Sequence, residues 1–374
     1  MRWIARILAV VVLIAVALAA GLRLTLGGGR YLEDRTTAPE LPAAALEKVA
    51  DLDSPPGNIA VSRTGRVFFT FHPDGHPPFA VAELVGGKPV PFPSAEAQAS
   101  FRSPLAVRID ARDRLWVLDH ADYAMGQPRL RAFDLATAAQ VHGYGFPSAV
   151  APLFSMLNDF QIDPGGATIY IADASPIVQR PALLTYDVVA GTSRRLLDGH
   201  ASVRPRDFIL HTAVRDMTLF GLVTLRIGVD TIALDRGGEW LYYGPVNGDR
   251  LYRVATRDLN DRTLAPEALA ARVEDYGPKP LSDGATTDDA GNVYLTDPEH
   301  SALLVLGPDR RLRTLMKDPR LRWPDGLSFG PDGWLYVTCS ALQYVLFTTA
   351  AERRAAAPYQ IWRLEPGATA APGQ

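Results

Sequence analysis

Residues 283–297 read DGATTDDAGNVYLTD, and this stretch decides the fold. A first short strand leads into the turn Asp-Ala-Gly-Asn, and a second strand rich in β-forming residues follows. Glycine supplies the positive φ of a tight hairpin turn, because it has no Cβ to clash. The stretch therefore predicts a β-hairpin.

The same plan recurs along the chain, which makes it an internal repeat rather than an isolated hairpin. A third strand follows several of the hairpins, as at residues 129–135, and a fourth is visible in places, as at residues 312–315. Repeated four-stranded units are typical of propeller blades. Six repeats predict an all-β, six-bladed β-propeller. The other five hairpins are GNIAVSRTGRVFFTF from Gly57, LAVRIDARDRLWVLD from Leu105, NDFQIDPGGATIYIAD from Asn158, DTIALDRGGEWLYYG from Asp230 and DGLSFGPDGWLYVT from Asp325.

The two ends of the repeat region predict how the ring closes. After the sixth hairpin one good strand remains, at residues 359–364, so the last blade lacks its outer strand. Residues 46–52 alternate like a strand but belong to no repeat. Pairing the two segments would leave no open sheet edge. We therefore expect an N-terminal strand to close the ring, and residues 201–225 to form an insertion over one face.

Composition narrows the class of protein. The chain has 374 residues, 47% of them hydrophobic and 21% charged, which is enough apolar sequence for a large core. Its net charge is −3 and it has no basic run interleaved with aromatic residues, so a nucleic-acid partner is not expected. A lone cysteine, Cys339, rules out an internal disulfide. We expect a monomer with a small-molecule ligand.

The N-terminus has the pattern of an export segment. Arg2 and Arg6 precede the uncharged, apolar residues 7–22, and Ala-Leu-Ala at residues 17–19 suits a signal peptidase. Residues 1–22 are thus a cleaved signal peptide or a membrane anchor, and either one places the folded part outside the cytoplasm, secreted or periplasmic. We expect a flexible tether over residues 23–45, the propeller over 46–366 and a disordered tail over 367–374.

Polar residues recur at equivalent positions of the repeats, where a propeller would bring them together. Alignment puts a polar residue at the start of four inner strands, which predicts a ligand site at one mouth of the channel. Aspartates at the ends of second strands, with a neighbouring histidine, are candidate acid–base residues. The alternative is that these residues only form turns, as Asp and Asn often do at strand ends. The ligand-binding candidates are Asn158, Asp159, Asp230, Asp283 and Asp325, and the catalytic candidates are Asp119, His120, Asp173 and Asp297.

Two other chemical signals are weak. Residues 326–330 match the G-x-S-x-G nucleophile pattern, but Ser328 falls inside a predicted inner strand with no helix after it. The seven histidines are dispersed without the spacing of a zinc site. Neither a serine nucleophile nor zinc is expected.

Several stretches taken together resemble the yellow/major royal jelly protein family. They are residues 103–110 with 115–119, 157–160 with 169–173, and 323–329 with 335–338. The resemblance implies a secreted six-bladed propeller with a ligand pocket at the channel mouth. Its insect members include dopachrome-converting enzymes, binders of biogenic amines and food proteins. One departure is Cys339-Ser340 where the family usually has Ser-Asn after the threonine.

The repeats are also similar, more distantly, to the gluconolactonase/senescence-marker propellers. That resemblance implies a divalent cation such as Ca²⁺, with Asn158, Asp230 and Asp283 as candidate ligands. The glutamate that completes the family's metal set is replaced here by Pro56. Three functions remain open: a dopachrome-tautomerase-like converting enzyme, a metal-dependent lactone hydrolase, and a non-catalytic binder of small amines or other metabolites.

Overall fold

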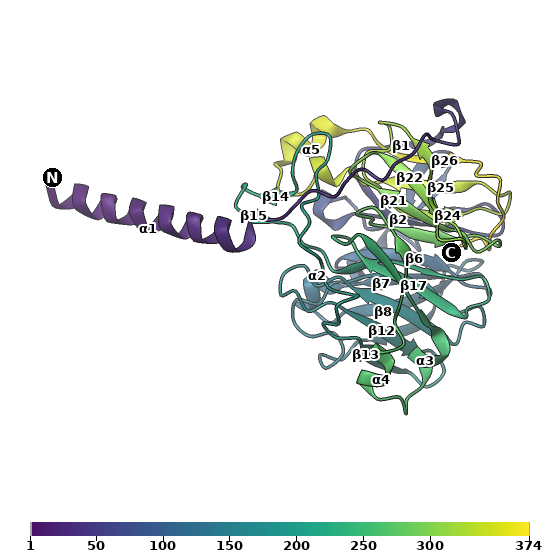
Figure 1. Cartoon of the computed structure of the whole chain (residues 1–374). Coiled ribbons are helices and arrows are strands. Elements are labelled where there is room, and N and C mark those ends of the chain that lie inside the picture. The colour runs from purple at the N-terminus through teal and green to yellow at the C-terminus, as the bar shows by residue number, and fades with distance from the viewer. Residues whose placement is uncertain (1, 374) are drawn as a thin grey trace.

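The computed structural model describes residues 2–373 and shows a six-bladed β-propeller from which one long helix projects (Figure 1). Each blade is a four-stranded antiparallel sheet whose strands follow one another in sequence from the axis outward, except in the last blade. The six repeats predicted from the sequence are thereby confirmed as six blades.

The strands of the first three blades have these bounds: β2 (Pro56–Val61), β3 (Val67–Phe71), β4 (Val81–Val85) and β5 (Lys88–Pro91); β6 (Pro104–Ile109), β7 (Arg114–Asp119), β8 (Arg129–Asp134) and β9 (Gln140–Gly145); β10 (Leu157–Ile162), β11 (Thr168–Asp173), β12 (Ala182–Asp187) and β13 (Thr192–Leu196). Those of the last three are β16 (Val229–Leu234), β17 (Trp240–Pro245), β18 (Arg250–Ala255) and β19 (Glu274–Pro278); β20 (Ala285–Thr287), β21 (Val293–Asp297), β22 (Ala302–Leu306) and β23 (Leu312–Lys317); β24 (Pro324–Phe329), β25 (Leu335–Cys339), β26 (Tyr359–Leu364) and β1 (Glu47–Leu52).

Helical segments are few. They are α1 (Arg2–Leu26), α2 (Ala121–Ala124), α3 (Thr256–Asn260), α4 (Pro266–Ala270) and α5 (Ala350–Ala356), with short 3₁₀ turns η1 (Ala43–Ala45), η2 (Pro73–Gly75), η3 (Glu96–Ser100) and η4 (Leu342–Tyr344). The segment between β13 and β16 contains the predicted insertion, which carries a two-stranded hairpin, β14 (Thr218–Leu219) and β15 (Val223–Thr224).

The core lies between neighbouring blades rather than at the axis. Trp116 of blade two and Phe160 of blade three belong to one such buried cluster. Side-chain hydroxyls also join adjacent blades: Thr70 Oγ1 donates to the carbonyl of Leu105 at 2.7 Å, and Thr338 Oγ1 donates to that of Gly57. Ser328 Oγ accepts from Val61 N at 3.1 Å and is fully buried, so this serine joins blades six and one.

The ring closes as the sequence predicts. Strand β1 pairs antiparallel with β26, with Leu52 opposite Tyr359, so an N-terminal strand becomes the outer strand of the sixth blade. The sheet order in this blade is therefore β24, β25, β26 and β1 from the axis outward. Because every blade then has four strands, the pairing leaves no incomplete sheet at the junction of the two chain ends.

The segments on either side of the propeller contact its surface. Arg35 Nη1 donates to the carbonyls of Asp249 and Lys279 at 2.7 and 2.9 Å, and Glu40 N donates to Thr314 O. At the other end of the chain, Gly373 O accepts from Ile109 N at 2.9 Å. The segments expected to be a tether and a tail thus both run along the blades in this structure.

Helix α1 is the one described helix that is long and apolar enough to cross a membrane. It spans 25 residues, and none of its residues is buried. Such a helix is consistent with the signal segment or anchor expected from the sequence, and hence with export.

Ring closure can be tested at Leu52, which is 2% exposed and packs in the cluster between blades six and one. We predict that Leu52→Ala lowers the free energy of unfolding by about 2–4 kcal/mol, the usual cost of a cavity at a buried leucine. The measurement is urea denaturation, with Val189→Ala, at an 87% exposed position, as the control. Equal stability of the two variants would contradict the placement of β1.

Candidate functional site

A cavity of about 640 Å³ opens at the end of the channel where the inner strands begin. We call this end the mouth face; it is formed by the loops that lead into the inner strands and that follow the second strands. All five predicted ligand-binding residues line the cavity, together with Asn58 of blade one. The structure thus brings together the polar residues that the repeat alignment placed at the starts of the inner strands.

Local distortions of the inner strands explain this convergence. The pairing register shifts near the start of β10, between Leu157 and Phe160, so the consecutive residues Asn158 and Asp159 both reach the cavity. The inner strands β2, β6, β16 and β24 show the same irregularity at their first residues. A bulge places two residues opposite one and re-aims their side chains, which a regular strand would point to opposite faces.

One buried guanidinium lies beside the carboxylates of the cavity. Arg108 is 1% exposed; its Nη2 donates to Asp159 Oδ2 at 2.8 Å and its Nη1 donates to Asn58 Oδ1. The ion pair joins blades two and three, and the second contact reaches blade one. Sequence reasoning missed Arg108, although a charged residue in the middle of the buried strand LAVRID was an available signal.

The other three carboxyls, Asp230, Asp283 and Asp325, share the cavity floor. None of them has an ion pair within 4 Å among residues 2–373, although the buried Lys279 acts on Asp283 from a longer distance. Asn158 Nδ2 donates to Asp230 Oδ2, and Trp323 Nε1 donates to Asp283 Oδ2 at 2.6 Å. Burial is the main cause that raises the pKa of Asp230 and of Asp325 well above its usual range, and the neighbouring Asp283 charge adds to it. We call Asp159, Asp230, Asp283 and Asp325 the acid ring; the raised pKa values of Asp230 and Asp325 favour the protonated form of these two carboxyls.

Two buried histidines lie on the mouth face; His72 lines the cavity, and the catalytic candidate His120 lies outside the lining. Burial lowers the pKa of His120 to about 4 and also lowers that of His72, so both imidazoles are neutral near pH 7. His120 Nδ1 accepts from Tyr123 N at 3.0 Å, whereas its Nε2 has no partner among the described residues. His72 and Tyr123 line the cavity. His72 was missed, although it follows the second strand of its blade as His120 does.

The loop that carries Tyr123 has an unusual backbone. Residues 121–124 all have φ between 52° and 56°, the left-handed region. None of the four is glycine, and each residue in this region costs of order 1 kcal/mol or more. The surrounding contacts therefore hold Tyr123 at the cavity against a local preference for another conformation.

The catalytic candidates Asp119, Asp173 and Asp297 occupy a different position from the one expected: they lie outside the cavity lining and hold the loops of the mouth face. Asp119 accepts from the backbone nitrogens of Ser103 and Ala121, each at 2.9 Å. Asp173 accepts from Arg195 Nη1 at 2.7 Å and Asp297 pairs with His300 Nδ1 at 2.9 Å. The physical reason is that a strand-end carboxylate satisfies the backbone donors of the turn beside it.

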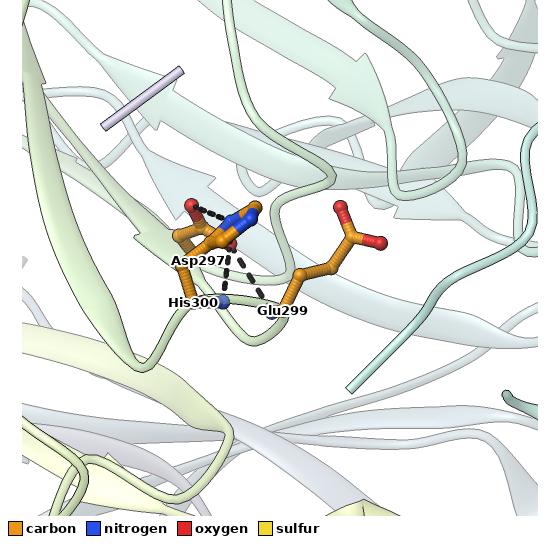
Figure 2. Close-up of side chains that lie close together, drawn as sticks. All are labelled: Asp297, Glu299 and His300. Atoms are coloured by element: carbon orange, nitrogen blue, oxygen red, sulfur yellow. Dashed lines mark hydrogen bonds and ion pairs between the residues drawn. The ribbon is translucent and has the colours of Figure 1, made fainter. Parts of the chain in front are cut away.

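The channel residues do not have the geometry of a hard-cation site. Among residues 2–373, the group of three acidic or histidine side chains with ligand atoms within 4.8 Å of one another is Asp297, Glu299 and His300 (Figure 2). Ca²⁺ takes six to eight oxygen ligands. The predicted metal set of Asn158, Asp230 and Asp283 offers three side chains, so water would have to supply the remaining ligands. The Asn158 amide nitrogen donates to Asp230, and this contact accounts for the proximity of the two side chains without a metal.

The Asp297 cluster of Figure 2 lies on the loop after β21 and is already internally bonded. Asp297 Oδ1 accepts from the backbone nitrogens of Glu299 and His300, each at 3.1 Å. Glu299 Oε1 accepts from His211 N at 2.8 Å, and burial raises the pKa of Glu299 to about 7. These contacts tie the loop to the insertion and account for the proximity of the three side chains.

The acid ring predicts a pH dependence of stability. Because the folded-state pKa of Asp230 is raised, its contribution is fully present below the unfolded pKa of about 4 and is lost as the pH rises through the folded value. We predict that Asp230→Asn reduces the fall in melting temperature between about pH 5 and about pH 8. Asp53→Asn, at an exposed position, is the matched control. If the melting temperatures of wild type and Asp230→Asn changed with pH in the same way, ionisation of Asp230 would not destabilise the fold.

Solved structures with the same architecture belong to several enzymes and binding proteins. A luciferin-regenerating enzyme shares 13% identity at a TM-score of 0.58, covering 88% of this chain and 97% of its own. A gluconolactonase from Xanthomonas campestris shares 13% identity at a TM-score of 0.55, with coverage of 90% and 97%. Regucalcin, a calcium-binding protein from Agrobacterium tumefaciens, shares 13% at 0.56, with coverage of 88% and 95%. At these identities the likeness establishes the fold alone.

Family membership follows from the sequence itself. No curated protein matches the chain significantly. The family model described as "Major royal jelly protein" matches residues 102–351, which is more than half of the chain and runs from blade two into the last blade. This agrees with the resemblance seen in the ordered strand motifs, and the chain belongs to the major royal jelly protein family.

Proposed function

We propose that the mouth cavity binds a small organic cation, such as an aromatic amine, with its charged group on the acid ring. The observation that carries the proposal is the charge at the floor: Asp159 is paired with Arg108, whereas Asp230, Asp283 and Asp325 line the cavity outside that pair. The basic residues of the lining, Arg226 and Arg353, come from the segment before β16 and from α5 instead. A cationic ligand would supply the charge that Asp230, Asp283 and Asp325 lack.

The walls of the cavity suit the rest of such a molecule. Apolar side chains from the insertion and from the segment between β25 and β26 line the same cavity as the acid ring, among them Leu225, Leu342 and Phe347. A volume of about 640 Å³ falls within the range of small-molecule sites. An amine with an aromatic body would therefore find a polar floor and an apolar wall.

Binding should be coupled to protons. The raised pKa values of Asp230, Asp283 and Asp325 favour protonated carboxyls in the free protein. A bound cation favours the ionised carboxylate and so lowers these pKa values. The affinity for a cation should therefore increase with pH, and binding should release protons to the buffer.

The test compares tryptamine with tryptophol, which carries a hydroxyl where tryptamine carries the ammonium group. We predict that the protein binds tryptamine at least about tenfold more tightly, a difference of about 1.4 kcal/mol. Asp283→Asn should remove most of this preference while leaving the melting temperature unchanged or raised. Isothermal titration calorimetry in buffers of different ionisation enthalpy measures the affinity and the released protons together.

Equal affinity for the two probes would refute the cation proposal. A large loss of stability in Asp283→Asn, with binding intact, would assign the ring a purely structural role. Titration with calcium chloride in the same cells tests the metal-dependent lactone hydrolase: tight calcium binding, together with hydrolysis of gluconolactone, would favour that function instead.

Conversion of the bound molecule by proton transfer is a second candidate function. His72 favours it, because a neutral imidazole in the cavity lining can accept a proton. His72 and Asp283 line the same cavity. Such a pair suits a tautomerisation of the dopachrome type, in which a proton leaves one atom of the substrate and is added at another.

We predict that the wild-type protein accelerates the loss of dopachrome absorbance and that His72→Gln reduces kcat by about 10²-fold or more, with little change in KM. His76→Gln is the matched control, since His76 also lines the cavity but is more exposed. Equal turnover in the two variants would contradict a role of His72 in catalysis. Absence of turnover in the wild type would contradict the conversion itself, and the function would then be binding alone.

A further inference from the structure

We infer that α1 remains attached as a membrane anchor and that the mouth face rests on the outer surface of the bilayer. The location of the mouth face does not depend on what the cavity binds. The consequence that ligands enter from the membrane interface does rest on the proposed function.

The helix has the length and composition of a span. Its 25 residues correspond to about 37 Å at 1.5 Å per residue, enough for a hydrocarbon layer of about 30 Å. None of its residues is buried against the propeller. Arg2 and Arg6 mark the cytoplasmic end, and Arg23 lies in the last turn, at the level of the outer headgroups.

The helix is joined to the propeller almost without slack. It ends at Leu26, and already the carbonyl of Gly28 accepts from Arg226 Nη2 at 2.8 Å and from Thr224 Oγ1 at 3.1 Å. A Cβ on Gly27 would lie 2.2 Å from the carbonyl oxygen of Leu222, so a glycine is needed for this close approach. Figure 1 shows α1 leaving the molecule beside β14 and β15.

The same hairpin forms part of the cavity. Leu219 of β14 and Val223 and Thr224 of β15 line the cavity. The anchor and the opening of the cavity therefore share one structural element. If α1 spans a membrane, the hairpin lies at its surface, and the mouth cannot be far from the headgroups.

The bulkiest exposed apolar side chains are distributed as this placement requires, whereas exposed valines also occur elsewhere, as at Val85, Val141 and Val189. Within residues 27–373, the exposed Met, Leu, Ile and Phe side chains all lie in loops of the mouth face: Met125, Leu153, Ile177, Phe220 and Phe347. Phe220, at the tip of the β14–β15 hairpin, is 85% exposed. Ile177 and Phe347 line the cavity. Five bulky apolar side chains on loops of one face, beside an anchor, suit insertion at the headgroup boundary.

The test uses the full chain in vesicles of phosphatidylcholine and phosphatidylglycerol. Phe220→Cys and Val189→Cys each receive an environment-sensitive dye; the native Cys339 is fully buried and does not compete. Val189 is the matched control: it is 87% exposed but lies in the β12–β13 turn, on the opposite face. Lipids that carry a nitroxide near the headgroup should quench the dye at position 220 at least about twofold and leave that at position 189 unchanged.

Three results would overturn the inference. Equal, weak quenching at both positions would mean that the mouth points away from the membrane. Recovery of the chain in the soluble fraction without α1 would mean that the helix is a cleaved signal. Cross-linking of Phe220→Cys into dimers without quenching would assign the face to a second copy. Quenching that persists when tryptamine fails to bind would separate the membrane placement from the proposed function.

Discussion

The pairing of β1 with β26 is the constraint on which the rest of the molecule depends. The last blade cannot be completed from its own repeat, so it takes its outer strand from the N-terminus. This choice dictates the path of the chain before β1, which contacts Asp249 and Lys279 and then Thr314 on its way to the sixth blade. The start of that path lies on the insertion, and α1 is held there for the same reason.

A closed ring also explains why the site is electrostatically unfavourable. Equivalent positions of six inner strands must face one axis, so aspartates that are far apart in sequence become neighbours in a buried space. Arg108 neutralises Asp159, while Asp230 and Asp325 keep raised pKa values through burial and mutual repulsion. A protein that only needed stability would place apolar residues there; retention of such groups at a cavity is a common cost of function.

The sequence predicted the fold and the site best at positions that all repeats share. It predicted them least well at positions where one blade differs from the others. The repeated hairpins, their turns and their strand composition predicted the blades and the closing strand. The polar residues at equivalent positions of the repeats predicted the floor of the cavity. Arg108, His72 and Trp323 each occur in one repeat only, so the alignment of repeats does not single them out. Their roles depend on contacts or charges from other blades, which the sequence does not show. Asp119 and Asp173 lie outside the cavity lining because their carboxylates accept hydrogen bonds from the adjacent loops and, for Asp173, from Arg195. A sequence pattern does not reveal such contacts.

The last residues of the chain have a consequence for how the cavity exchanges its contents. A second hollow of about 320 Å³ at the opposite end of the channel is lined by Ala371 and Pro372, and Gly373 is hydrogen-bonded to Ile109 there. The C-terminal segment thus lies over this end of the channel, while the mouth cavity opens at the other end. A molecule bound in the mouth cavity would then exchange through the mouth face, and its residence time, rather than flow along the axis, would set the rate of exchange.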